Sequence, residues 1–199
     1  MPHVIVIAGP NGAGKSTIAP FLLRDKLGVT EFVNADIIAQ GLSAYSPEKA
    51  ALAAGRIMLN RIGELVESEE NFAFETTLSS RTFVQKLRRM QESGYDVSVV
   101  FLWLASEDLA ILRVAERVKQ GGHHIPAKTI RRRFQIGLKN FFQLYRNLAD
   151  NWYFYDNSDV VELRLIASGN SVGTEMVFDE LLWNTIKLKY ENQDQTRYR

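Results

Sequence analysis

The residues with the clearest chemical meaning lie near the N-terminus, where an apolar run leads directly into a glycine-rich stretch. Residues 4–8 read Val-Ile-Val-Ile-Ala, and residues 9–17 read Gly-Pro-Asn-Gly-Ala-Gly-Lys-Ser-Thr. The second stretch fits the pattern G-x-x-x-x-G-K-[ST] at every fixed position. A strand before such a loop and a helix after it place backbone N–H groups and the positive end of a helix dipole around an anion. We therefore predict that this stretch binds a nucleoside triphosphate with Mg²⁺.

Two side chains of this loop have distinct predicted roles. Lys15 is expected to reach the β- and γ-phosphates, and the Ser16 hydroxyl is expected to ligate Mg²⁺. A dinucleotide-binding loop would need glycine at position 17, so Thr17 excludes that alternative. A glycine-rich turn without a ligand is disfavoured, because the flanking strand and helix are both present. The other predicted nucleotide-binding residues of the loop are Gly9, Pro10, Asn11, Gly12, Ala13, Gly14 and Thr17.

Asp36 is our candidate for the carboxylate that accepts a proton from an alcohol during phosphoryl transfer. It follows a predicted strand at 31–36, which we expect to lie adjacent to strand 4–8 and to open onto the same crevice. The alternatives for Asp36 are a helix N-cap and an indirect contact to Mg²⁺.

Glu75 and Thr77 follow a third predicted strand at 71–75. A carboxylate and hydroxyls at that edge suit hydrogen bonding to a polyhydroxylated acceptor, and capping of the next helix is the alternative. A Mg²⁺-binding Asp would be expected at the end of the most apolar strand, 96–104. The nearest acids, at 107 and 108, instead come a few residues after the strand ends. The sequence therefore leaves open which carboxylate supports Mg²⁺.

Arginines flank a glycine-containing turn in the region 113–133, which we predict to be a helical lid. Arg113 and Arg117 are one helical turn apart, Gly-Gly follows at 121–122, and three arginines follow at 131–133. A closing lid brings guanidinium groups onto a triphosphate, where they stabilise the charge of the transferring group. Three successive arginines cannot share one helix face, so at most two of them point into the site. The alternatives are an exposed basic helix pair and a nucleic-acid patch.

Other polar and aromatic residues give weaker signals. His123 and His124 are adjacent, so a transition-metal site is disfavoured against lid contacts or plain exposure. Asn157 follows a strand at 152–156 and is a candidate for a hydrogen bond to adenine. The aromatic residues at 152–155 fit a buried strand better than a base-stacking surface.

Strands that are apolar throughout alternate with helical segments, which is typical of an α/β fold with a parallel sheet covered on both faces. In such sheets the functional residues follow the strands, as they do here. The predicted strands cover 4–8, 31–36, 71–75, 96–104, 152–156 and 160–167, and the predicted helices cover 15–27, 47–66, 80–93, 106–120, 127–149 and 174–190.

Composition describes one soluble globular domain, 1–199, with a polar tail at 191–199. The formal net charge of +1 argues against a dedicated nucleic-acid binder. The chain has no cysteine, no apolar run of membrane-spanning length and no recognisable signal peptide. We therefore expect a cytoplasmic protein without membrane or nucleic-acid partners.

Four motifs, taken in order, resemble the zeta-toxin family of P-loop kinases over roughly residues 4–158. They are the loop at 9–17, Val-Asn-Ala-Asp at 33–36, Phe-Glu-Thr-Thr at 74–77, and Arg-Val-Lys-Gln-Gly-Gly-His-His-Ile-Pro at 117–126 with the arginines after it. The resemblance implies a P-loop NTPase three-layer sandwich, with a mostly parallel sheet of about five strands flanked by helices.

The resemblance also implies a function. ATP and Mg²⁺ would be held by Lys15 and Ser16, and Asp36 would be the base. Arg117 and one of Arg131 or Arg132 would neutralise the γ-phosphate, with Arg131 our candidate, and Glu75 and Thr77 would face the acceptor. Relatives of this kind phosphorylate UDP-N-acetylglucosamine, a nucleotide sugar, and are inhibited by an antitoxin protein, so kinase activity is the broader expectation and this acceptor a hypothesis within it.

Two other functions remain open from the sequence. One is a nucleotide-regulated toxin component that uses ATP to order the lid around a protein partner. The other is a polynucleotide kinase whose arginines at 131–133 grip phosphates, which the near-neutral net charge disfavours.

Overall fold

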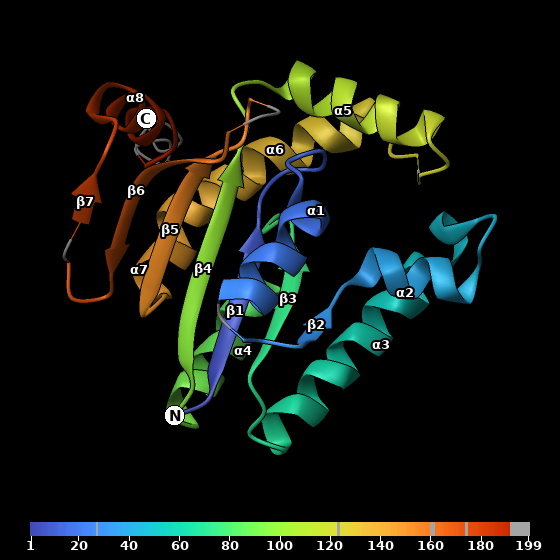
Figure 1. The fold of residues 1–199 in the computed structure, drawn as a ribbon, viewed down its shortest axis with the longest axis horizontal. Coiled ribbons are helices and arrows are strands. Elements are labelled where there is room, and N and C mark those ends of the chain that lie inside the picture. Colours follow the sequence, from blue (N-terminus) through green and yellow to red (C-terminus); the bar gives the residue numbers. More distant parts are fainter. Residues whose placement is uncertain (27, 123, 160–161, 174, 192–199) are drawn as a thin grey trace, which may run out of the picture.

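A single sheet of seven strands forms the centre of the computed structural model, which describes residues 1–26, 28–122, 124–159, 162–173 and 175–191. The strands are β1 (His3–Ala8), β2 (Glu31–Val33), β3 (Phe72–Thr76), β4 (Asp96–Trp103), β5 (Asn151–Asp156), β6 (Arg164–Asn170) and β7 (Glu175–Val177). Their order across the sheet is β2-β3-β1-β4-β5-β6-β7 (Figure 1). The first five of these are parallel, which confirms the predicted α/β class.

The strand count differs from the expected five because the sheet continues past β5. Strand β6 pairs antiparallel with β5, and β7 pairs antiparallel with β6. Only residues 157–163 connect β5 to β6, and a parallel connection needs a crossover of about a dozen residues or more. The last predicted helix, 174–190, is also corrected, since residues 175–177 form β7 and the helix begins at Glu180.

Helices cover the sheet on both faces. In Figure 1, α1 lies in front of β1, whereas α4, α6 and α7 lie behind the sheet, and α2 with α3 flanks the β2 edge. Two of the predicted helices, 15–27 and 127–149, contain a π-helical turn, η1 and η2. The helical elements are α1 (Lys15–Pro20), η1 (Phe21–Lys26), α2 (Ala35–Leu42), α3 (Pro47–Glu67), α4 (Thr82–Glu92), α5 (Glu107–Lys119), α6 (Ala127–Asn140), η2 (Phe141–Tyr145), α7 (Arg146–Leu148) and α8 (Glu180–Glu191).

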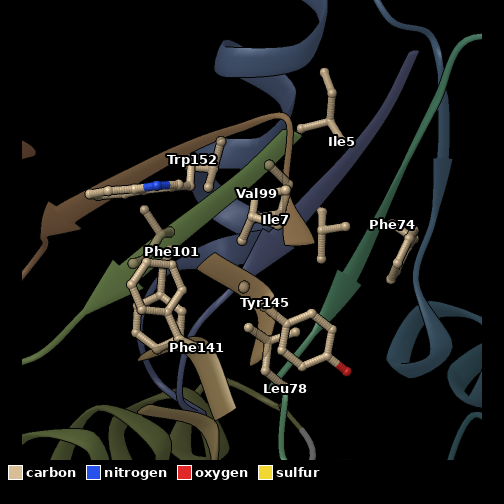
Figure 2. Packing of buried hydrophobic residues seen from close by; sticks show 14 of the residues in the cluster. Ile5, Ile7, Phe74, Leu78, Val99, Phe101, Phe141, Tyr145 and Trp152 are labelled. Atoms are coloured by element: carbon tan, nitrogen blue, oxygen red, sulfur yellow. The ribbon is translucent and has the colours of Figure 1, made fainter. Parts of the chain in front are cut away.

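Aromatic packing on one face of the sheet holds the C-terminal helices in place. The Phe101 ring lies 4.9 Å from Phe141 between ring centroids, and the two side chains face each other in Figure 2. Phe154 packs edge-on against Trp183 of α8 at 5.2 Å. Trp152 and Phe154 are therefore core residues, as expected, whereas Tyr153 alternates to the opposite face and is 38% exposed.

Strand order corrects the predicted position of the strand before Asp36. Strand β3 pairs with β1, and β2 pairs with β3, so β2 is not adjacent to the strand that precedes the phosphate-binding loop. The strand also ends earlier than predicted, at Val33, and Asp36 lies in the first turn of α2. Glu75, near the end of β3, is consequently the carboxylate closer to the loop. In the described part of the chain, no helix is both long enough and apolar enough to cross a bilayer.

Candidate active site

The glycine-rich loop connects β1 to α1 and is shaped by close backbone contacts. Gly14, which precedes α1, has a left-handed backbone with φ 78°, and a Cβ atom there would lie 2.7 Å from Asn157 Nδ2. At Gly9, with φ 142°, a Cβ atom would lie 2.3 Å from the Leu102 carbonyl oxygen of β4. Any side chain at these two positions would push the loop away from its neighbours.

Lys15 and Ser16 begin α1, and both contact the Glu75 carboxylate. The Lys15 ammonium is buried, donates to the Pro10 carbonyl oxygen at 3.0 Å and lies 3.5 Å from Glu75 Oε1. The Ser16 hydroxyl donates to Glu75 Oε2 at 2.6 Å. The carboxylate and the carbonyl together satisfy a buried positive charge at the bottom of the loop.

Asn34, which lies between β2 and α2, contacts both Ser16 and Glu75. Its side chain is 4% exposed, and its Nδ2 donates to Glu75 Oε2 at 2.7 Å and to Ser16 Oγ at 3.4 Å. Its Oδ1 accepts from the backbone N–H groups of Asp36 and Ile37, so Asn34 is the N-cap of α2. The alternative considered for Asp36, that of an N-cap, is therefore wrong.

A cavity of about 510 Å³ opens beside the loop. Its lining includes Lys15, Ser16, Asp36, Glu75 and Arg117, from four different elements. The Asp36 side chain is exposed and faces this cavity from the first turn of α2. The fold thus brings together the predicted lysine, serine, arginine and both carboxylates.

The three consecutive arginines of α6 have different surroundings. Arg131 donates to Glu107 at 3.0 Å and to Asp108 at 2.7 Å, in the first turn of α5, and lines a separate cavity between α5, α6 and α8. Arg132 is exposed. Arg133 instead donates to Asn11 Oδ1 of the phosphate-binding loop at 3.3 Å.

These contacts favour Arg133 over Arg131 as the second arginine near the phosphate-binding loop, and a catalytic role for either remains a prediction. Burial lowers the pKa of the Arg133 guanidinium, and the nearby Asp36 carboxylate opposes that shift. Helical periodicity alone does not separate the two, since Arg133 lies three residues after buried Ile130 and Arg131 lies three residues before buried Phe134.

A family model described as zeta toxin matches residues 1–166. The chain belongs to the zeta toxin family. This assignment confirms the resemblance seen in the four sequence motifs. An uncharacterized protein of Haemophilus influenzae is 28% identical over 130 residues, which cover 65% of this chain and 91% of that protein.

Solved structures share the zeta toxin fold. A crystal structure of AvrRxo1-ORF1:AvrRxo1-ORF2 with sulphate ions has a TM-score of 0.74 at 17% identity, covering 94% of this chain and 63% of that one. A crystal structure of the same pair with ATP has a TM-score of 0.71 at 18% identity, with the same coverage. The PezAT toxin–antitoxin system of Streptococcus pneumoniae gives 0.64 at 16% identity, covering 92% of this chain and 78% of that one. The chain therefore spans less than two thirds of the AvrRxo1-ORF1:AvrRxo1-ORF2 chain that it matches.

Asn157 holds the phosphate-binding loop in place through a hydrogen bond to its backbone. Its Nδ2 donates to the Ala13 carbonyl oxygen at 2.8 Å, and its own carbonyl accepts from Arg113 at 2.6 Å. Arg113 also donates to the Ser158 carbonyl oxygen at 2.9 Å. Sequence reasoning grouped Arg113 with the lid and did not anticipate this bracing role, for which no local pattern exists. A hydrogen bond from Asn157 to adenine remains a prediction.

Other predicted residues lie away from the loop. The Thr77 hydroxyl lies 2.8 Å from Ser79 Oγ, and Thr77 is not among the described residues that line the cavity, so its acceptor role remains a prediction. His124 is exposed, and His123 lies outside the described residues. The described ranges contain no cluster of three His, Cys, Asp or Glu residues suited to a metal ion.

Proposed function

We propose that this zeta toxin family member is a phosphotransferase that moves the γ-phosphate of ATP to a hydroxyl group of a small molecule. The observation that carries the proposal is the single cavity lined by Lys15, Ser16, Asp36, Glu75 and Arg117. A phosphate-binding loop alone fits any nucleotide-binding protein, but the same cavity also holds an exposed carboxylate and a guanidinium, which phosphoryl transfer to an alcohol requires.

In the proposed reaction, Asp36 accepts the proton of the acceptor hydroxyl. The acceptor oxygen forms a bond to the γ-phosphorus, the bond from that phosphorus to the bridging oxygen of ADP breaks, and ADP leaves. Lys15 exchanges its contacts with the Pro10 carbonyl and Glu75 for phosphate oxygens. Arg117 and Arg133 neutralise the negative charge of the transferring group. Arg133 donates to Asn11 of the loop, and this contact supports a position for its guanidinium near the transferring group.

The side chains at the start of α1 suit Mg²⁺. The Ser16 hydroxyl and the Glu75 carboxylate supply hard oxygen donors within 2.6 Å of each other, which is the donor type that Mg²⁺ prefers. Bound there, Mg²⁺ would neutralise charge on the β- and γ-phosphates. We therefore assign Glu75 to the metal side of the site rather than to the acceptor.

A nucleotide sugar is the acceptor class that we propose, with UDP-N-acetylglucosamine as the specific hypothesis. Its support is membership of the zeta toxin family and the match of all four motifs. A protein partner of the antitoxin type is also proposed, because similar folds occur in the AvrRxo1-ORF1:AvrRxo1-ORF2 pair and in the PezAT system. The need for ATP favours the cytoplasm as the site of action.

The test is transfer from γ-labelled ATP with Mg²⁺ to a panel of nucleotide sugars, nucleosides and free sugars. Labelled UDP-N-acetylglucosamine would support the whole proposal. A different labelled acceptor would retain the phosphotransferase and remove the specific substrate. Absence of any labelled product from protein that still binds ATP would contradict the phosphotransferase itself.

A further inference from the structure

The Asn34 side chain is the meeting point of three elements that the proposed reaction needs. It follows β2 and precedes α2, which carries Asp36, and its amide contacts Glu75 of β3 and Ser16 of α1. Glu75 lies 41 positions and Ser16 lies 18 positions from Asn34 in the chain, so the contacts are tertiary. A residue whose only task was to cap a helix would need none of them.

The chemistry of the amide fixes which atom faces which partner. Two backbone N–H groups point at one side-chain atom, at 2.8 Å from Asp36 and 3.2 Å from Ile37, and only the carbonyl oxygen can accept both. The NH₂ group must then face Glu75 Oε2, at 2.7 Å, where a carboxylate oxygen needs a donor. Aspartate would keep the cap but would oppose the Glu75 carboxylate, and serine would keep the cap but is too short to reach Glu75.

We infer that Asn34 is a positioning residue that holds the Glu75 carboxylate against Ser16 and, through the same amide, fixes the start of the helix that carries Asp36. This inference rests on the proposed function, because it gives Glu75 a role beside Mg²⁺. One buried side chain thus contacts both Glu75, on the proposed metal side of the cavity, and the start of the helix that carries Asp36, the proposed proton acceptor. It therefore fixes the positions of these two carboxylates relative to each other. The contact that orients Glu75 works through a hydrogen bond of about 2.7 Å, a distance that tolerates little displacement.

The experiment measures nucleotide binding, so it needs no acceptor. The affinity of a non-hydrolysable ATP analogue is titrated with Mg²⁺ and with EDTA, and the ratio of the two affinities is the Mg²⁺ gain. Asn34→Ser retains the helix cap and removes the donor to Glu75. We expect its Mg²⁺ gain to fall about tenfold, as for loss of residues that orient a metal ligand, with the EDTA affinity within about twofold of wild type. Asn34→Thr, which fills more of the site, serves if Asn34→Ser does not fold.

A second arm asks whether Asn34 acts through Glu75. In a Glu75→Gln background the carboxylate is already gone, so adding Asn34→Ser should change the Mg²⁺ gain by less than about twofold. Asn60, exposed on α3, is the matched control, and Asn60→Ser should leave the Mg²⁺ gain unchanged. Additive losses in the double variant would overturn the inference, because the two residues would then act independently.

The outcomes separate this inference from the proposed function. An unchanged Mg²⁺ gain in Asn34→Ser, or a wild-type protein whose binding does not respond to Mg²⁺, would overturn the role of Asn34 even if phosphate transfer occurs. A tenfold loss that disappears in the Glu75→Gln background would support it even if no acceptor is ever labelled.

Discussion

Glu75 and Asp36 are carboxylates at the edge of one cavity, yet their surroundings give them different chemistry. Glu75 accepts hydrogen bonds from Ser16 and Asn34 and lies 3.5 Å from the Lys15 ammonium, so its oxygens are engaged on the phosphate side. Asp36 is exposed, and the contact that the structure gives it near the helix cap is made by its backbone N–H. This difference is why we assign Glu75 to the metal and Asp36 to the proton.

Arg133 and Arg132 are neighbours in sequence with different environments, which makes them a matched pair. Arg133→Ala should lower kcat by about 100-fold or more, because an arginine that neutralises a transferring phosphoryl group contributes several kcal/mol to the transition state. Arg132 is exposed, so Arg132→Ala should leave kcat within about threefold of wild type. Steady-state kinetics on both variants checks this, and a larger loss in Arg132→Ala than in Arg133→Ala would contradict the assigned register.

At the scale of elements, α6 connects the arginines to the segment after β3. The middle of α6 carries Arg133, and its last residue, Asn140, which is buried, donates to the Leu78 carbonyl oxygen at 2.6 Å. Leu78 is itself buried with φ 52°, a left-handed conformation that is strained for a leucine. Gly137 lies so close to the Thr77 carbonyl oxygen that a Cβ atom would approach it to 2.4 Å.

Removal of the Asn140 amide should release this strained segment. Asn140→Ala leaves the buried Leu78 carbonyl without its donor, so the free energy of unfolding should fall by about 1–3 kcal/mol. Urea denaturation measures the change. Asn60→Ala on the exposed side of α3 is the control and should change the free energy by less than about 0.5 kcal/mol. Equal stabilities of the two variants would show that α6 does not hold the segment.

Most helices and strands could be predicted from the sequence, because each is specified by the residues within it. The apolar runs and the glycine-rich loop specify β1 and the start of α1, and the periodicity of α6 is strong. The order of the strands in the sheet could not be predicted from the sequence, since whether β2 or β3 pairs with β1 depends on packing between distant segments. For the same reason the roles of Asn34 and Arg113 were not found, as their partners are far away in the chain.

At the scale of the whole molecule, the sheet order determines the site. Placing β3 between β2 and β1 puts Glu75 directly beside the loop and Asp36 one strand further out. Strand β3 thus lies between the loop and the strand before Asp36, and Asn34 contacts both Glu75 and the start of the helix that carries Asp36. The aromatic packing of Figure 2 belongs to the core that supports this sheet, and both Tyr145 and Leu78 are buried in it.

Tyr145 gives the folded molecule a dependence on alkaline pH. Burial raises its pKa from 10.0 to about 12, and its hydroxyl donates to the Ser80 carbonyl oxygen at 2.8 Å. The unfolded chain ionises this group first as pH rises, so its contribution is fully present below about pH 10 and is lost between about pH 10 and 12. A shift of this size corresponds to a loss on the order of 2–3 kcal/mol.

Unfolding free energies measured at pH 8 and at about pH 11 check this dependence. Tyr145→Phe cannot ionise at this position, so its stability should fall less steeply than that of wild type over the same interval. The variant should also be less stable at pH 8 by about 1 kcal/mol, since the Ser80 carbonyl loses its donor. Parallel pH profiles for the two proteins would contradict the assignment to Tyr145.

The most direct test of the central claim compares wild type with Asp36→Asn in single-turnover transfer from γ-labelled ATP, with ATP affinity measured on the same samples. Asparagine preserves the shape of the side chain and the helix start, but it cannot accept the proton of the acceptor hydroxyl. We predict that transfer falls at least about 100-fold while the ATP affinity stays within about twofold, because Lys15 and Ser16 are untouched. Transfer by Asp36→Asn at the wild-type rate would contradict the account, since no base would then be needed at that position.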